Sequence, residues 1–145
     1  MMFRTALLCT LLATTPVLAG EFETYETDLS FEDATFAIEN AILGEGLVID
    51  SVSHVGEMLE RTKADIGATA TIFAAADVFQ FCSARVSREV MEADPANLRF
   101  CPYGIHVWQM PDSETVLVGH DRYEGTMAPV QDLLSGIVKE ALELD

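Results

Sequence analysis

Cys82 and Cys101 constrain the fold of this chain more than any other residues, because they are the only cysteines left once an N-terminal leader is removed. Cys82 follows Phe79 and Phe81 in a segment whose side chains alternate with the period of a β-strand. Cys101 opens another apolar segment, and a helix is predicted between the two. If that helix crosses back over the sheet, the two strands are neighbours and their sulfur atoms lie close together. We therefore place any chemistry of this chain at these two cysteines.

Residues 1–19 predict an export signal. Arg4 precedes an apolar run, Ala6–Leu12, which is too short to span a bilayer, and small residues precede a cleavage point after Ala19. Cys9 lies inside the apolar run, too early to be the lipidated first residue of a mature chain. We expect a periplasmic or secreted product that is not bound to the membrane after signal cleavage.

The composition excludes several classes of partner. The chain carries 24 acidic and eight basic residues, which gives a formal net charge of -16. Removal of the predicted signal takes away one of the basic residues, Arg4, and makes the mature chain more acidic. Nucleic acids and anionic lipid surfaces require clustered Lys and Arg, so neither is expected as a partner. Residues 20–145 have the usual length of one domain.

Hydrophobic periodicity and turn residues predict the elements of that domain. Strands are predicted over 21–28, 47–55, 78–84, 98–110 and 114–121. Helices are predicted over 31–44, 56–62, part of 64–76, 85–93 and 129–141. The expected fold class is α+β, a single compact domain with a mainly antiparallel sheet of about four to five strands and helices packed on one face.

Three separated segments of the mature chain resemble the bacterial and archaeal domain-of-unknown-function 302 family. They are residues 54–62 (HVGEMLERT), 77–84 (DVFQFCSA) and 101–105 (CPYGI). The match covers nearly all of residues 20–145 and is similar to the exported branch of the family. The resemblance implies a compact α+β domain without an agreed activity that forms a homodimer.

His106, Trp108 and His120 depart from the pattern of this family, in which aliphatic, Tyr or Arg residues are more usual near these strand positions. A site that depended on these three residues would therefore gain no support from the resemblance.

Three interpretations of Cys82 and Cys101 remain open. A structural disulfide would close a loop of about 20 residues and stabilise the fold by roughly 3 kcal/mol. In a redox or sulfur-handling pair, Cys82 would be the exposed nucleophile near a helix start and Cys101 would resolve it. Two separate cysteines would act as small apolar core residues. Cys82 shares the strand parity of Val78, and Cys101 that of Ile105 and Val107, which indicates inward-pointing side chains.

Basic residues near the cysteines suggest an anionic ligand, because Arg85, Arg88 and Arg99 stand close to them in a chain with few bases. The predicted ligand-binding residues are Phe81, Cys82, Arg85, Arg88, Cys101 and Tyr103. The alternative is that Arg85 and Arg88 form solvated ion pairs with the acidic residues four positions later.

Soft ligands also suggest a copper site made of His54, Met58, Cys82 and Cys101, with His106 or His120 as further candidates. Against it, the cysteines lack the short spacing of a strong metal motif, and a polar strand end and a core Met explain His54 and Met58 equally well.

No phosphate-binding loop, nucleophile elbow or zinc-protease motif occurs in the sequence, so the chain is more readily explained as a non-enzyme. We predict a periplasmic binding or accessory module for an unidentified small ligand or periplasmic protein, with its site near Cys82 and Cys101. The alternatives are a thiol redox or sulfur-handling protein that uses the same cysteines and a copper or haem carrier. No cofactor is predicted.

Overall fold

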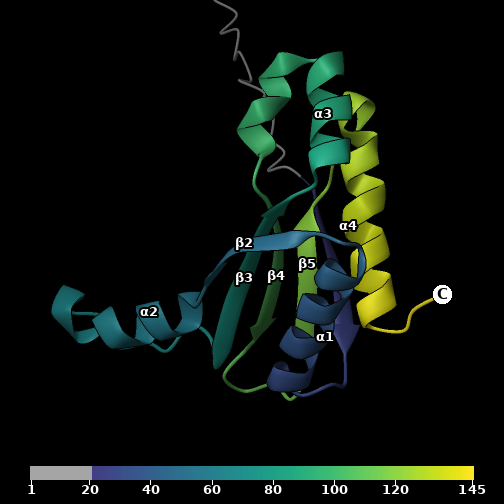
Figure 1. Ribbon diagram of the computed structural model, residues 1–145. Coiled ribbons are helices and arrows are strands. Elements are labelled where there is room, and N and C mark those ends of the chain that lie inside the picture. Colours follow the sequence, from purple (N-terminus) through teal and green to yellow (C-terminus); the bar gives the residue numbers. More distant parts are fainter. Residues whose placement is uncertain (1–20) are drawn as a thin grey trace, which may run out of the picture.

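A computed structural model describes residues 21–145, so the predicted signal at 1–19 lies outside the described residues. Five strands form one antiparallel sheet in the order β1-β5-β4-β3-β2 (Figure 1). The strands are β1 (Phe22–Thr27), β2 (Val48–Ser53), β3 (Ala75–Cys82), β4 (Tyr103–Gln109) and β5 (Val116–Asp121). The helices are α1 (Phe31–Gly44), α2 (Val55–Thr62), α3 (Ala84–Ala93) and α4 (Ala128–Ala141). The predicted α+β class and the number of strands are confirmed.

Three short 3-10 helices complete the described chain: η1 (Ala64–Ile66), η2 (Pro95–Phe100) and η3 (Gly125–Met127). No helix within residues 21–145 is long and apolar enough to cross a membrane.

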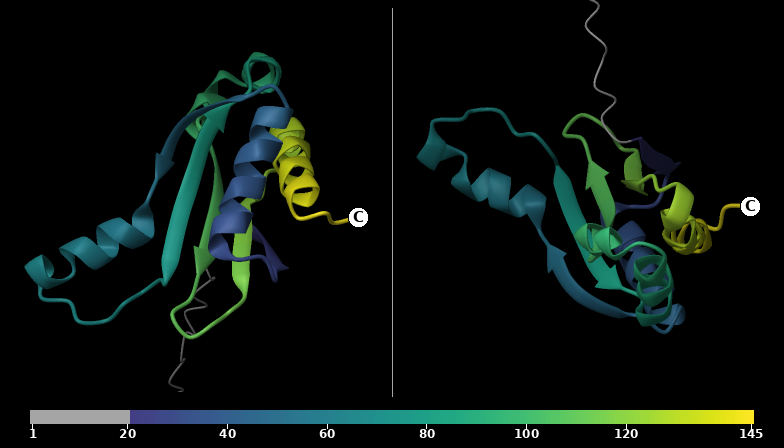
Figure 2. Two further views of the ribbon diagram at one scale, coloured as in Figure 1. Left: turned by 60° about the horizontal axis from the view of Figure 1, so that its bottom comes forward. Right: turned by 90° about the horizontal axis from the view of Figure 1, so that it is seen from above.

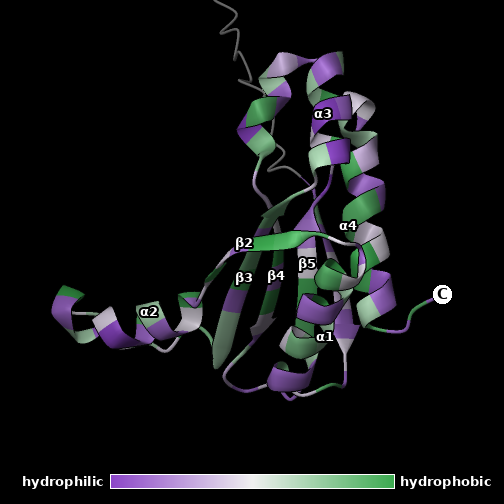
Figure 3. Ribbon diagram, in the orientation of Figure 1, coloured by the Kyte–Doolittle hydropathy of each residue, from purple (hydrophilic) through white to green (hydrophobic). Residues whose placement is uncertain are grey.

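Helices α1, α3 and α4 lie on one side of the sheet (Figure 2). Their apolar stripes meet the inward-facing residues of the strands, and Figure 3 shows hydrophobic and hydrophilic residues mixed along each of these helices. The largest contributors to this buried layer are Ile38, Ile42, Phe81, Tyr103, Ile105, Leu134 and Ile137. One face of the sheet therefore supplies the core, and the other face remains without a helical cover.

Local sequence signals explain where the helices of the core begin. Ser30 caps α1, since its Oγ accepts a hydrogen bond of 3.1 Å from the backbone nitrogen of Asp33. Ser83 caps α3 in the same way and accepts from the backbone nitrogen of Val86 at 3.3 Å. In α4, Pro129 occupies the first turn, where its missing N–H leaves no donor unsatisfied.

The strand predicted over 98–110 begins too early. β4 starts only at Tyr103, because Asp94 and Pro95 direct the chain into the turns of η2. The Asp94 carboxylate accepts a hydrogen bond of 2.9 Å from the backbone nitrogen of Ala96, and Pro95 suits the first position of a helical turn. The apolar residues before Cys101 thus belong to a 3-10 helix and not to a strand.

Residues 55–74, which we call the arm, differ from the predicted arrangement of helices on one face. The arm contains α2, η1 and an extended return to β3, and it projects away from the side that α1 and α4 cover (Figures 1 and 2). Helix formation predicted within 64–76 is limited to η1, because Gly67 ends the turn with a φ of 70°.

Gly56 and Gly136 differ in how much space surrounds them, so substitution of each by alanine tests the packing of its helix. A Cβ at Gly56 in α2 would stand 2.7 Å from the backbone nitrogen of Ala76, whereas one at Gly136 in α4 would meet nothing within 4 Å. Gly56→Ala should destabilise the fold by about 1–3 kcal/mol through overpacking. Gly136→Ala should stabilise it by about 0.5–1 kcal/mol, since Ala is the better residue within a helix. Urea unfolding followed by circular dichroism measures both, and equal effects of the two variants would contradict the close approach at Gly56.

Candidate functional site

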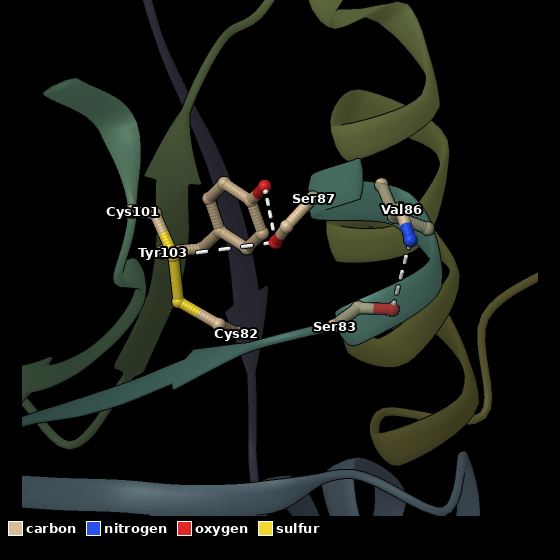
Figure 4. The surroundings of a disulfide bond; sticks show 6 residues. All are labelled: Cys82, Ser83, Val86, Ser87, Cys101 and Tyr103. Carbon is tan, nitrogen blue, oxygen red and sulfur yellow. Dashed lines mark hydrogen bonds between the residues drawn. A yellow bond between two sulfur atoms is a disulfide. The ribbon is translucent and has the colours of Figure 1, made fainter. Parts of the chain in front are cut away.

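Cys82 and Cys101 form a disulfide across the ends of two neighbouring strands (Figure 4). β3 pairs with β4 so that Phe81 lies opposite Tyr103, and this register leaves the two cysteines with a Cα–Cα distance of 6.2 Å. A separation of about 6 Å is ordinary for a disulfide. The predicted adjacency is confirmed, and the interpretation as two separate core cysteines is wrong.

The disulfide encloses α3 and η2, which leave the sheet at Cys82 and return to it after Cys101. Ser87 of α3 lies beside it, with its Oγ 4.0 Å from the Cys101 sulfur and 2.9 Å from the Tyr103 hydroxyl (Figure 4). Cys82 immediately precedes the cap of α3, so the free amides of the first helical turn lie close in sequence. Both cysteines are half-buried.

The prediction that both cysteines point inward is wrong for Cys82. Phe79 and Phe81 occupy the buried side of β3, and Cys82 shares the opposite parity with Val78 and Gln80. Aromatic rings bury more apolar area than a cysteine or valine does, so they take the core-facing positions. Cys101 lies before β4 and packs against the edge of the core.

The six residues predicted to bind a ligand do not line one cavity. Phe81 and Tyr103 are fully buried in the core, and Arg85 and Arg88 stand exposed on α3. Arg85 pairs with Glu89 at 3.8 Å and Arg88 with Glu92 at 2.9 Å, which is the alternative arrangement considered for these residues. Such exposed pairs contribute little to stability.

A groove of about 450 Å³ lies between η2 and the segment that joins β5 to η3; we call it the η2 groove. The side chains that line it include Asn97, Arg99, Phe100, Arg122 and Tyr123. The Arg99 guanidinium lies 4.4 Å from the centre of the Phe100 ring, and this ring meets Tyr123 edge to face at 5.5 Å. Burial raises the pKa of Tyr123 to about 12, so its phenol stays neutral at physiological pH.

Asn97 fixes η2 against its neighbours. Its side chain is buried, and its amide nitrogen donates to the backbone oxygen of Val90 at 2.8 Å and to the Thr126 hydroxyl at 3.1 Å. These bonds connect α3, η2 and η3. The wall of the η2 groove is therefore held by both a covalent bond and a buried amide.

The two arginines of the η2 groove differ in their partners. Arg122 forms ion pairs with Glu21 at 3.0 Å and with Glu23 at 3.7 Å. Arg99 has no ion pair among residues 21–145. Its positive charge is not neutralised by a carboxylate, although Asp94, Asp121 and Glu124 also line the groove.

The structure does not bring together the residues predicted to bind copper. His54 and Met58 belong to the end of β2 and to the arm, whereas Cys82 lies opposite Val48 at the other end of the β2–β3 pair. His54 Nδ1 instead lies 2.8 Å from the Asp77 carboxylate. No group of three or more His, Cys, Asp or Glu in the described part of the chain is arranged to hold a metal ion.

The two additional histidines lie on opposite faces of the sheet, since His106 pairs with Gly119 and the next residue, His120, points to the other side. His120 is buried, with Nδ1 2.8 Å from the Asp121 backbone oxygen and Nε2 3.3 Å from the Ser135 hydroxyl. His106 lies on the sheet face that α1 and α4 do not cover, beside the Phe22 ring.

Comparison with known proteins gives a family and a fold. The model of the family described as "Domain of unknown function DUF302" matches residues 23–144. The crystal structure of an uncharacterized conserved protein DUF302 from Bacillus stearothermophilus superposes with a TM-score of 0.69 at 14% identity. The match covers 83% of this chain and 97% of that chain. No curated protein matches the sequence.

The interaction between His54 and Asp77 should be measurable in solution as a shift in the pKa of the His54 imidazole. The hydrogen bond and the charge of Asp77 raise the pKa of His54 above its ordinary value of 6.5. A raised folded-state pKa stabilises the fold fully below pH 6.5, and this contribution is lost as the pH rises through the folded-state value. NMR titration of the imidazole should show a pKa above 6.5, and Asp77→Asn should lower it. An unchanged pKa in Asp77→Asn would show that the pair is not formed.

Proposed function

Since the chain belongs to the DUF302 family, whose function is not established, we propose from its own geometry that it is an exported binding module whose ligand site is the η2 groove. The ligand class is a small organic anion with an aromatic or apolar part. The observation that carries this proposal is the position of Arg99, an exposed cation without a carboxylate partner, which lies over the Phe100 ring at the wall of the groove.

The disulfide supports the proposal because it determines where η2 lies. Arg99 and Phe100 directly precede Cys101, so the covalent bond to Cys82 limits the positions that both groove residues can take. Sites that are held in place before binding lose less conformational entropy when the ligand arrives. A disulfide of this kind also suits the oxidising compartment that an export signal implies.

The chemistry of the η2 groove supports the ligand class. A guanidinium donates several hydrogen bonds in a plane, which matches a carboxylate, sulfonate or phosphate group. Phe100 and the neutral Tyr123 supply an aromatic surface beside it. The acidic side chains around the groove disfavour ligands with several negative charges.

The fluorescent anion 8-anilinonaphthalene-1-sulfonate is a suitable probe, because it combines a sulfonate with aromatic rings. Arg99→Gln should weaken its binding about tenfold, since a hydrogen bond to a charged group is worth about 1.5–3 kcal/mol. Arg85→Gln is the matched control, because Arg85 lies exposed on α3 and does not line the groove. Fluorescence titration measures both variants. Equal affinities of the two variants would rule out the η2 groove as the anion site.

A thiol redox function is the second candidate, and the contact between Ser87 and Cys101 favours it. A partner dithiol would supply two electrons and two protons, so that Cys82 and Cys101 become thiols while the partner forms a disulfide. In the reduced state the Ser87 hydroxyl can donate to a Cys101 thiolate, and the first turn of α3 favours a negative charge near Cys82.

Glutathione buffers of graded composition, followed by alkylation and intact-mass analysis, test this second function. Ser87→Ala should shift the equilibrium toward the disulfide by about tenfold, because the thiolate loses a hydrogen-bond donor. Ser51→Ala is the control, since Ser51 bonds Gln80 at 2.9 Å on an exposed edge strand. A disulfide that resists reduction at every glutathione ratio would contradict the redox function and indicate that the disulfide is purely structural.

A further inference from the structure

Cys82 and Cys101 are anchored to different degrees. Cys82 is the last residue of β3, where it pairs with Val48 of β2, and the residue that caps α3 follows it directly. Cys101 belongs to no strand. It follows η2, and its backbone nitrogen donates to the backbone oxygen of Leu98 at 3.1 Å. A change in the bond between the two sulfur atoms therefore displaces Cys101 and the end of η2 more easily than it displaces Cys82.

Reduction of the disulfide requires the two sulfur atoms to separate. In any disulfide the sulfur atoms are bonded at about 2.05 Å, whereas non-bonded heavy atoms stand about 3.5–4.0 Å apart. A partner dithiol would supply two electrons and two protons, so that the S–S bond breaks, Cys82 and Cys101 become thiols and the partner forms a disulfide. The two sulfur atoms then move apart by roughly 1.5–2 Å. The redox state of the pair thus changes the position of the chain around Cys101.

Helix α3 offers a hydrogen-bond partner to the Cys101 thiol. The Ser87 Oγ lies 4.0 Å from the Cys101 sulfur and 2.9 Å from the Tyr103 hydroxyl (Figure 4). Once the disulfide is broken, the Cys101 sulfur can approach Ser87 and form a closer hydrogen bond with it. The chain around Cys101 therefore has a favourable position in each of the two redox states.

The displaced end of η2 carries two residues of the η2 groove. Arg99 and Phe100 directly precede Cys101 in the sequence, and both line the groove. Asn97, nearer the start of η2, is buried and hydrogen-bonded to α3 and to η3. These bonds hold Asn97 in place in both redox states. The movement that follows reduction therefore falls on residues 98–101.

The shape of the η2 groove depends on where these residues lie relative to Tyr123. The Arg99 guanidinium lies 4.4 Å from the centre of the Phe100 ring, and this ring meets Tyr123 at 5.5 Å. Tyr123 comes from the segment after β5, which the disulfide does not enclose, so it does not move with η2. A shift of about 1 Å separates a good hydrogen bond from a lost one. Displacement of η2 would therefore misalign the guanidinium with a bound anion.

We propose that, given the proposed binding function of the η2 groove on which this inference rests, the redox state of Cys82 and Cys101 controls the affinity of the groove for its anion. The disulfide form binds the anion, and the dithiol form releases it. The expected difference in affinity is about tenfold, within the range of 5–150-fold that is common for coupled sites. Coupling between two sites is reciprocal, so a bound anion protects the disulfide from reduction by the same factor.

Fluorescence titration with 8-anilinonaphthalene-1-sulfonate, with and without dithiothreitol, tests this coupling. Reduction of the wild type should weaken binding of the probe about tenfold. Arg99→Gln should weaken binding in the disulfide form and have little effect in the dithiol form, where the guanidinium is no longer aligned. Arg85→Gln is the matched control outside the groove and should follow the wild type in both states. The double variant Cys82→Ala and Cys101→Ala should bind like the reduced wild type and not respond to dithiothreitol.

Glutathione buffers provide the reciprocal measurement. At saturating 8-anilinonaphthalene-1-sulfonate, the thiol–disulfide equilibrium of the wild type should move toward the disulfide by the same factor of about ten. The equilibrium of Arg99→Gln should not move, because this variant binds the probe equally in both redox states. Alkylation followed by intact-mass analysis measures both proteins. An equilibrium of the wild type that does not respond to the probe would overturn the coupling.

Failure of this redox control can be distinguished from failure of the proposed function. If Arg99→Gln and Arg85→Gln bind the probe equally in the disulfide form, the groove is not the anion site and both proposals fail. If Arg99→Gln binds more weakly but reduction of the wild type changes nothing, the groove remains the anion site and the redox control is wrong. Circular dichroism of the reduced protein gives a further test. Loss of the fold on reduction would overturn the redox control, because the disulfide would then hold the whole domain.

Discussion

The pairing of β3 with β4 determines where the disulfide and the base of the arm lie. Its register sets Phe81 opposite Tyr103 at one end, which brings Cys82 and Cys101 within disulfide distance. At the other end the same pair of strands carries Ala76 and Trp108, which line a hollow of about 250 Å³ at the base of the arm. One antiparallel ladder therefore connects the disulfide and the η2 groove, at one end of the sheet, to the base of the arm at the other.

Features that depend on neighbouring residues could be predicted from the sequence. The Ser30 cap of α1, the hairpin between β4 and β5 and the start of α4 follow from chemistry within a few residues, and the structure has all of them. Apolar content alone was a poorer guide. The residues before Cys101 are apolar enough for a strand, but the side chain of Asp94 and the ring of Pro95 favour turns there. Local hydrogen bonding outweighed the hydrophobic pattern at that point.

The candidate site could be predicted only in part, because its residues come from segments that are distant in the sequence. The proximity of Cys82 and Cys101 followed from the expected return of α3, and it is present. Predicting the η2 groove would have required knowledge that η2 faces the end of β5, an arrangement that brings Arg99 and Phe100 to Tyr123. Arg99 beside Cys101 was the one available signal. Periodicity reports which side of an element is buried, but it does not report which other element covers that side.

The arm is attached to the sheet at a narrow base, where Gly56 touches the backbone of Ala75 and Ala76 and His54 holds Asp77. α2 and η1 together extend roughly 18 Å from that base, given the rise per residue of the two helix types. A tilt of about 10° at the base would then displace the far end by about 3 Å, close to the width of a methyl group. The position of Ile66 thus depends on a few backbone atoms at the start of β3. A small change in backbone angle there produces a much larger displacement at the far end of the arm.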